Sequence, residues 1–257
     1  MDVALCTITN SVYDIATFEA LGEPCISTLR RHLLCPRCLG PGFYRKAAPN
    51  GRAASFGARA HQPYCDVDGA VRQADQTDVL APGEKVAGNE RIHVDFDYGI
   101  RLPRPWAANA ETCPQANQRR LNTLLRNLMF NPGFDRSEQL VSVETGVFTV
   151  RELFMPFARA DVDEQGRMRG YWGLVSDAAQ SGDQPPCLWL NSGGRNDLSV
   201  VVDSGVTDDF VQRFPVQELE DLAGAYMLVF GCLRRSRNDK KYIAVSDISR
   251  ITLDKLA

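Results

Sequence analysis

The sequence lacks any run of about 18 apolar residues, which excludes a membrane-spanning helix. Its first residues include Asp2 and no basic stretch ahead of an apolar run, so we expect no secretory signal and a cytoplasmic location. Walker, G-x-S-x-G and HExxH motifs are absent as well, which removes the commonest signatures of nucleotide hydrolysis, serine hydrolysis and metalloprotease activity.

Acidic residues are absent from one long stretch, between Pro24 and Cys65, although the whole chain has a net charge of −3. This first basic island contains seven cations: Arg30, Arg31, Arg37, Arg45, Lys46, Arg52 and Arg59. A second basic island lies at residues 233–241, with five cations and one acid. Cationic islands in an otherwise acidic protein indicate either a nucleic-acid interface or ordinary solvated surface.

The chain has eight cysteines and three histidines, and four of these residues have the spacing of a zinc site. Cys35 and Cys38 form a C-x2-C pair, and after 22 further residues His61 and Cys65 form an H-x3-C pair. Each pair can present two ligands from one turn, and four nitrogen and sulfur ligands suit tetrahedral zinc. Because the segment is too polar to have its own core, we predict one structural zinc per chain. If His61 or Cys65 is not a ligand, the nearby Cys25 and His32 are the alternative ligands.

The segment LLCPRCLGPGFYRKAAPNGRAASFGARAHQPYC, residues 33–65, resembles the zinc-binding segment of competence CoiA-type proteins. In that family a C-x2-C knuckle, a basic hairpin and an H-x3-C element precede a nuclease domain. The resemblance implies a zinc module here. The family's nuclease motif, an Asp followed by Glu-x-Lys on a strand, has no match, since Glu84-Lys85 lacks the spacing.

Alternating apolar residues predict five short strands near the C-terminus, with one helix at 207–214 between the third and the fourth. The strands are expected at residues 168–175, 187–190, 198–203, 225–233 and 241–248. This arrangement resembles an OB-fold, a five-stranded barrel that commonly binds single-stranded nucleic acid. The resemblance implies a closed barrel with a nucleic-acid-binding face, and an SH3-like barrel or half-sandwich remains an alternative.

The same alternation places Leu188 and Leu190 inside and Trp189 outside, and likewise Ile243 and Val245 inside and Tyr242 outside. Outward aromatic rings beside a basic loop can stack bases while cations contact phosphates. The predicted nucleic-acid-binding residues therefore combine the two aromatics with cations of both islands: Arg45, Lys46, Arg52, Arg59, Trp189, Arg234, Arg235, Arg237, Lys240, Lys241 and Tyr242.

The predicted fold is α+β, with four successive parts. An N-terminal helical segment (1–32) precedes a zinc ribbon or knuckle module (33–68). A linker and mixed α/β region (69–160) follows, with a helix at 117–130 ended by Asn131-Pro132-Gly133. An OB-like barrel (165–257) completes the chain.

The expected function is non-catalytic binding of single-stranded DNA or RNA. One alternative is a structural subunit that holds protein partners in a nucleic-acid-processing complex, such as an antiviral defence or mobile-element complex. A second alternative is a metal-dependent nuclease that would use Asp95 and Asp97, which lie two apart on a predicted strand.

Overall fold

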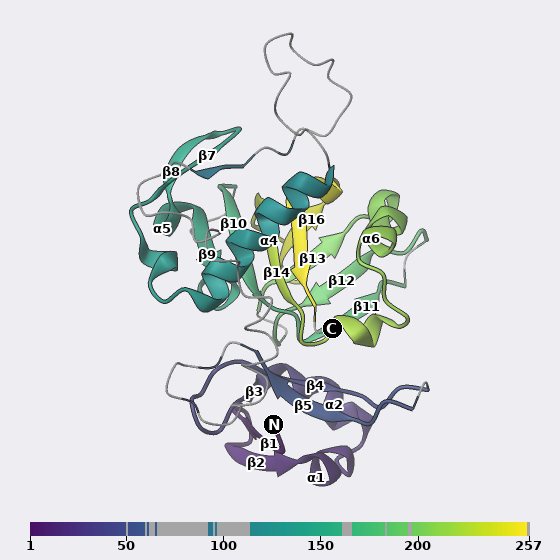
Figure 1. Ribbon diagram of the computed structural model, residues 1–257. Coiled ribbons are helices and arrows are strands. Elements are labelled where there is room, and N and C mark those ends of the chain that lie inside the picture. Colours follow the sequence, from purple (N-terminus) through teal and green to yellow (C-terminus); the bar gives the residue numbers. More distant parts are fainter. Residues whose placement is uncertain are drawn as a thin grey trace.

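The structure is a computed structural model of the chain. It describes residues 1–49, 51–59, 61, 65, 92–94, 96, 114–160, 166–182, 184–194 and 197–255, with only the backbone of 93 and 114–120. The described residues form the predicted mixed α+β structure, and their strands belong to several separate sheets. Figure 1 shows two parts, which we call the N-terminal module (residues 1–65) and the body (residues 92–255).

The N-terminal module consists of a small sheet, two short helices and a hairpin around one core. Phe18, Tyr44 and Phe56 fill this core, with ring centroids 5.1–5.8 Å apart. The elements are β1 (Val3–Cys6), β2 (Ser11–Asp14), α1 (Ile15–Glu19), α2 (Glu23–Leu29), β3 (Leu33–Leu34), β4 (Gly42–Arg45) and β5 (Ser55–Ala58). Because the hairpin β4–β5 shares its core with the first helices, residues 1–34 and the hairpin fold as one unit.

The first 32 residues, predicted to be helical, also contain two strands. Residues 3–6 and 11–14 pair as an antiparallel hairpin, so the helix begins only at Ile15. The carboxylate of Asp14 accepts a 2.7 Å hydrogen bond from the Thr17 amide and caps that helix. Residues 12–18 therefore span the end of a strand and the start of a helix.

Two sheets pack face to face in the body. A four-stranded sheet has the order β17-β14-β10-β9, and a five-stranded sheet has the order β11-β12-β13-β16-β15. The strands are β9 (Phe154–Pro156), β10 (Met168–Leu174), β11 (Asp177–Gln180), β12 (Leu188–Asn191), β13 (Ser199–Val202), β14 (Tyr226–Cys232), β15 (Arg234–Arg235), β16 (Lys241–Val245) and β17 (Ile251–Asp254).

The four-stranded sheet is the middle of three layers. One of its faces packs against the five-stranded sheet and α6 (Thr207–Arg213), and the other packs against α4 (Pro114–Phe130). Alternate residues of β14 point to opposite cores: Met227 and Val229 to the first, Leu228 and Phe230 to the second. A strand buried on both faces is therefore apolar throughout.

The predicted strands and helix of the C-terminal region are confirmed, but the single barrel is not. Segments 168–175 and 225–233 belong to the four-stranded sheet, and segments 187–190, 198–203 and 241–248 belong to the five-stranded sheet. Among the described residues neither sheet is closed. The prediction failed because alternation identifies a strand and its faces, while the pairing partners depend on long-range packing.

A smaller sheet and α5 (Val150–Leu153) lie beside α4. That sheet joins β6 (Ile92–His93), β7 (Leu140–Val143) and β8 (Gly146–Thr149). The predicted helix at 117–130 is confirmed as part of α4, and Gly133 follows it with a positive φ of 83°. No helix in the described part of the chain has the length and apolar character needed to cross a membrane.

Candidate metal centre and nucleic-acid interface

The four predicted metal ligands lie together in the N-terminal module. The ligand atoms of Cys35, Cys38, His61 and Cys65 all lie within 4.8 Å of one another, and the three cysteines are buried. The Sγ atoms of Cys35 and Cys65 are 3.8 Å apart, and Cys38 Sγ lies 3.3 Å from His61 Nδ1. A tetrahedral ion with bonds of about 2.0–2.3 Å needs ligand atoms separated by about 3.5–3.8 Å. This group can therefore hold one metal ion with little rearrangement.

A tight turn after β3 presents the first ligand pair. The Cys35 amide donates to the Gly40 carbonyl oxygen (2.8 Å), and the Leu39 amide donates to the Cys35 carbonyl oxygen (2.9 Å). Leu39 has a φ of 56°, so the left-handed position of this turn belongs to a leucine, not to Gly40. Because Leu39 is exposed, its side chain can point to solvent while the backbone closes around the metal centre.

The substitute ligands Cys25 and His32 lie outside this group of four. The Cys25 side chain is exposed, and His32 packs beside Gly194 of the body. Among the remaining cysteines, Cys6 is buried in the module core, Cys187 and Cys232 are partly exposed, and Cys113 lies outside the described residues.

Several cations of the first basic island contact carboxylates or carbonyl oxygens of the body. Arg45 donates to the Ala223 carbonyl oxygen (2.8 Å), Arg52 pairs with Asp221 (2.5 Å) and Arg59 pairs with Asp254 (3.0 Å). Lys46 pairs instead with Glu23 of its own module (2.5 Å) and is more exposed. The predicted phosphate ligands Arg45, Arg52 and Arg59 therefore have contacts within the chain.

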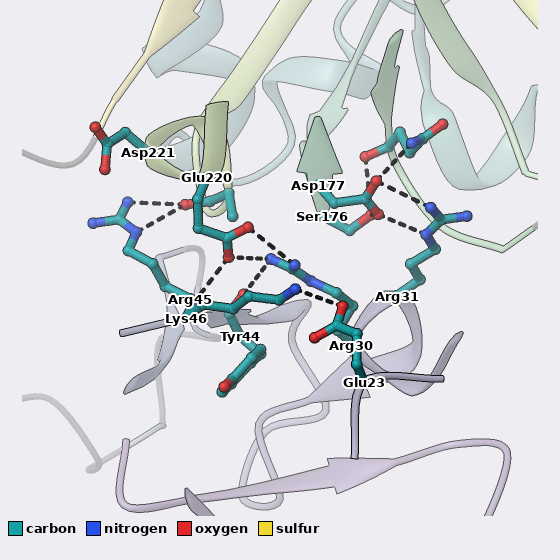
Figure 2. A network of polar contacts seen from close by, with 12 residues as sticks. Glu23, Arg30, Arg31, Tyr44, Arg45, Lys46, Ser176, Asp177, Glu220 and Asp221 are labelled. Carbon is teal, nitrogen blue, oxygen red and sulfur yellow. Dashed lines mark hydrogen bonds and ion pairs between the residues drawn. The ribbon is translucent and has the colours of Figure 1, made fainter. Parts of the chain in front are cut away.

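Two further arginines of this island complete the contact between module and body. Arg30 makes two hydrogen bonds to the carboxylate of Glu220, and Arg31 makes two to Asp177 (2.6 and 3.0 Å) (Figure 2). Paired hydrogen bonds of this kind are the strongest that arginine makes with a carboxylate.

Burial raises the pKa of Asp221 while its hydrogen bond from Arg52 lowers it, and the net pKa lies below the ordinary value.

Sequence reasoning missed this interface, although its signal is in the composition. A 42-residue stretch without a single acid faces a remainder of the chain that is strongly acidic. Opposite charges on two parts of one chain favour pairing between those parts as well as binding of an external polyanion.

The predicted aromatic pair lies on the outer face of the five-stranded sheet. Trp189 on β12 and Tyr242 on β16 contact each other across the intervening strand β13, and their ring centroids are 6.2 Å apart. Leu188, Leu190 and Ile243 point to the opposite face and are buried in the core between the sheets. The predicted inward and outward faces of these strands are confirmed.

A row of polar side chains extends from this pair across the sheet. Strand register aligns Asp177, Asn191, Ser199, Tyr242 and Arg234. Within the row, Ser199 donates to the Asn191 side chain (2.7 Å), and Asn191 donates to Asp177 (2.6 Å). Since Asp177 also accepts from Arg31, this row connects the N-terminal module to the strands that carry the aromatic pair.

The cations of the second basic island differ in exposure. Arg234 and Arg237 are exposed, whereas Arg235 pairs with Asp239. Lys240 donates to the Gly194 carbonyl oxygen (3.0 Å), and Lys241 donates to that of Ala160 (2.9 Å). Burial, followed by the nearby Arg31, lowers the pKa of Lys240. Arg234 and Arg237 are thus the predicted cations of this island best placed to meet an external anion.

The carboxylates considered for a nuclease, Asp95 and Asp97, lie outside the described residues. No protein-family model matches the chain, and no curated protein matches it.

Proposed function

We propose that this chain is a zinc-containing protein that binds single-stranded nucleic acid without cutting it. The observation that carries the proposal is the contact between Trp189 and Tyr242 on the outermost layer of the body. Base stacking on aromatic rings contributes roughly 1–3 kcal/mol per base and works with any sequence. Both side chains are partly exposed. The neighbouring Arg234 and Arg237 supply positive charge for the phosphates.

The metal part of the proposal rests on the donor set. Three thiolates and one imidazole, in a closed group with buried cysteines, are the ligands of structural zinc sites. Four protein ligands leave no coordination position for a substrate, so the metal would stabilise the module and take no part in chemistry.

The binding surface proposed here is smaller than the full set of predicted residues. It comprises Trp189, Tyr242, Arg234 and Arg237. Phosphate binding by Arg45, Arg52 or Arg59 would require breaking their contacts with carboxylates or carbonyl oxygens of the body.

The test is a fluorescence polarisation titration with single- and double-stranded oligonucleotides over a range of salt concentrations. The double reversal R234E/R237E should weaken single-strand binding, and each lost phosphate contact should reduce the salt slope by about 0.7. The double reversal R136E/R151E changes the net charge equally on another exposed part of the body and serves as the control.

Equal weakening by both double reversals would mean that only net charge matters and would contradict this surface. No binding by the unaltered chain would reject the nucleic-acid proposal and favour a subunit that acts through protein contacts.

A further inference from the structure

One buried carboxylate of the body is shared by two arginines from different parts of the chain. Asp254, the last residue of β17, accepts hydrogen bonds from Arg59 of the N-terminal module (3.0 Å) and Arg126 of α4 (3.1 Å). Arg59 also donates to the Asp254 carbonyl oxygen. The side chains of Arg59 and Asp254 are only 7% and 8% exposed. Water therefore replaces this ion pair poorly if Arg59 withdraws.

Arg59 lies next to the metal centre in the chain. Arg59 directly follows β5 and stands two residues before the ligand His61. The preceding residue, Ala58, packs against the three cysteine ligands. Metal ligation would attach the end of this segment, through His61 and Cys65, to the knuckle that carries Cys35 and Cys38.

The other main contact between module and body does not depend on the metal in this way. Arg30 donates to the Tyr44 carbonyl oxygen (2.9 Å) and lies over the Tyr44 ring, so the module core fixes it. From that position it reaches Glu220. Removal of the metal should therefore affect the Arg59 contact much more than the Arg30 contact.

We propose that the metal centre controls the contact of Arg59 with Asp254, and that metal occupancy thereby sets the stability of strand β17. β17 is an edge strand, since its only neighbour among the described strands is β14, so loss of a contact at its end favours local opening. This inference rests on the metal half of the proposed function and not on nucleic-acid binding.

The test is amide hydrogen exchange of the full chain, with and without metal, after elemental analysis has established the metal content. Removal of the metal by a chelator should speed exchange in residues 251–254 about tenfold or more. R59A should retain the metal and show the same increase. Metal removal from R59A should then add little, because the contact is already lost. R52A, which removes another arginine of the same interface, should leave the metal effect on β17 intact.

If the effects of R59A and of metal removal on the exchange of β17 are fully additive, the proposal is overturned. Unchanged exchange in β17 after removal of the metal would also overturn it. An equal increase in the central strand β13 would also overturn it, because metal loss would then unfold the whole body. Absence of bound metal in the purified protein would instead reject the metal site itself, which separates the two failures.

Discussion

The ring of Phe43 in β4 lies so close to Gly224 of the body that a Cβ atom built on Gly224 would be 2.5 Å from Phe43 Cε2. Phe43 is 3% exposed and belongs to the same core as Leu228 and Phe230 of the four-stranded sheet. It is therefore the apolar anchor of the contact between module and body, and the arginine contacts surround it. Interfaces of this design concentrate their binding energy in the central aromatic residue.

We predict that Gly224→Ala destabilises the protein by about 1–3 kcal/mol, because Gly224 has a φ of 88° and the added methyl group would collide with Phe43. Urea unfolding measures the change. Gly133→Ala is the matched control, since Gly133 has a similar φ of 83° but a Cβ there would meet no atom within 4 Å. Equal effects of the two substitutions would show that Phe43 can move away without cost.

The metal centre predicts about one zinc per chain in protein purified without added metal, as expected for a structural site. Cys35→Ser should lose the zinc and make the segments that carry the ligands, around residues 35–38 and 61–65, sensitive to protease, because the metal holds these segments together. Cys25→Ser, an exposed cysteine outside the group, should retain both zinc and resistance. Folded protein with less than about a tenth of the expected zinc would rule out the structural site.

Trp189→Ala should weaken binding of a single-stranded oligonucleotide by about 1–3 kcal/mol and leave the salt slope unchanged, since stacking involves no counterion release. Trp189→Phe should retain part of the affinity, because an aromatic face remains at the position. Polarisation titrations at several salt concentrations give both quantities. An affinity identical to that of the unaltered chain would show that the Trp189–Tyr242 pair is not the binding surface.

Glu152→Gln should lower the melting temperature near neutral pH but not in acid. The Thr149 amide (2.9 Å) and then its hydroxyl (2.8 Å) donate to the Glu152 carboxylate and hold its pKa below the ordinary value of 4.5. A carboxyl group with a lowered pKa stabilises the fold above its unfolded pKa, and this stabilisation is lost as pH falls through the folded pKa. Melting curves from about pH 7 to pH 3 should show the difference vanishing at the acidic end. A difference that persists there would assign the effect to side-chain geometry instead of charge.

Local pattern was sufficient for the metal centre and for the strand faces. The ligand spacing of Cys35, Cys38, His61 and Cys65 alone identified four side chains that the fold brings together. Alternation likewise placed Trp189 and Tyr242 on the outside, because side chains of a strand point to opposite faces in turn.

The pairing of the strands and the contacts of the first basic island were not predictable in this way. The apolar run of β14, Tyr226–Phe230, is typical of a strand buried on both faces, yet the sequence does not say what covers each face. Arg30 and Arg59 reach Glu220 and Asp254, which are far away in the chain. A run of cations predicts an acidic counterpart but not whether it belongs to the same chain.

The parallel pairing of β13 with β16 has a consequence for folding kinetics. These strands are neighbours in the sheet, yet α6, β14 and β15 intervene in the chain. Long-range parallel pairs form slowly, because the entropy of closing a large loop must be overcome before the contacts form. Trp189 lies on β12, which pairs with β13 as a local antiparallel hairpin. Tyr242 lies on β16 and comes close to Trp189 only when β16 pairs with β13. The two rings can therefore meet only when β13 and β16 pair, so quenching or shifting of Trp189 fluorescence would report this long-range pairing and not the formation of the local hairpins.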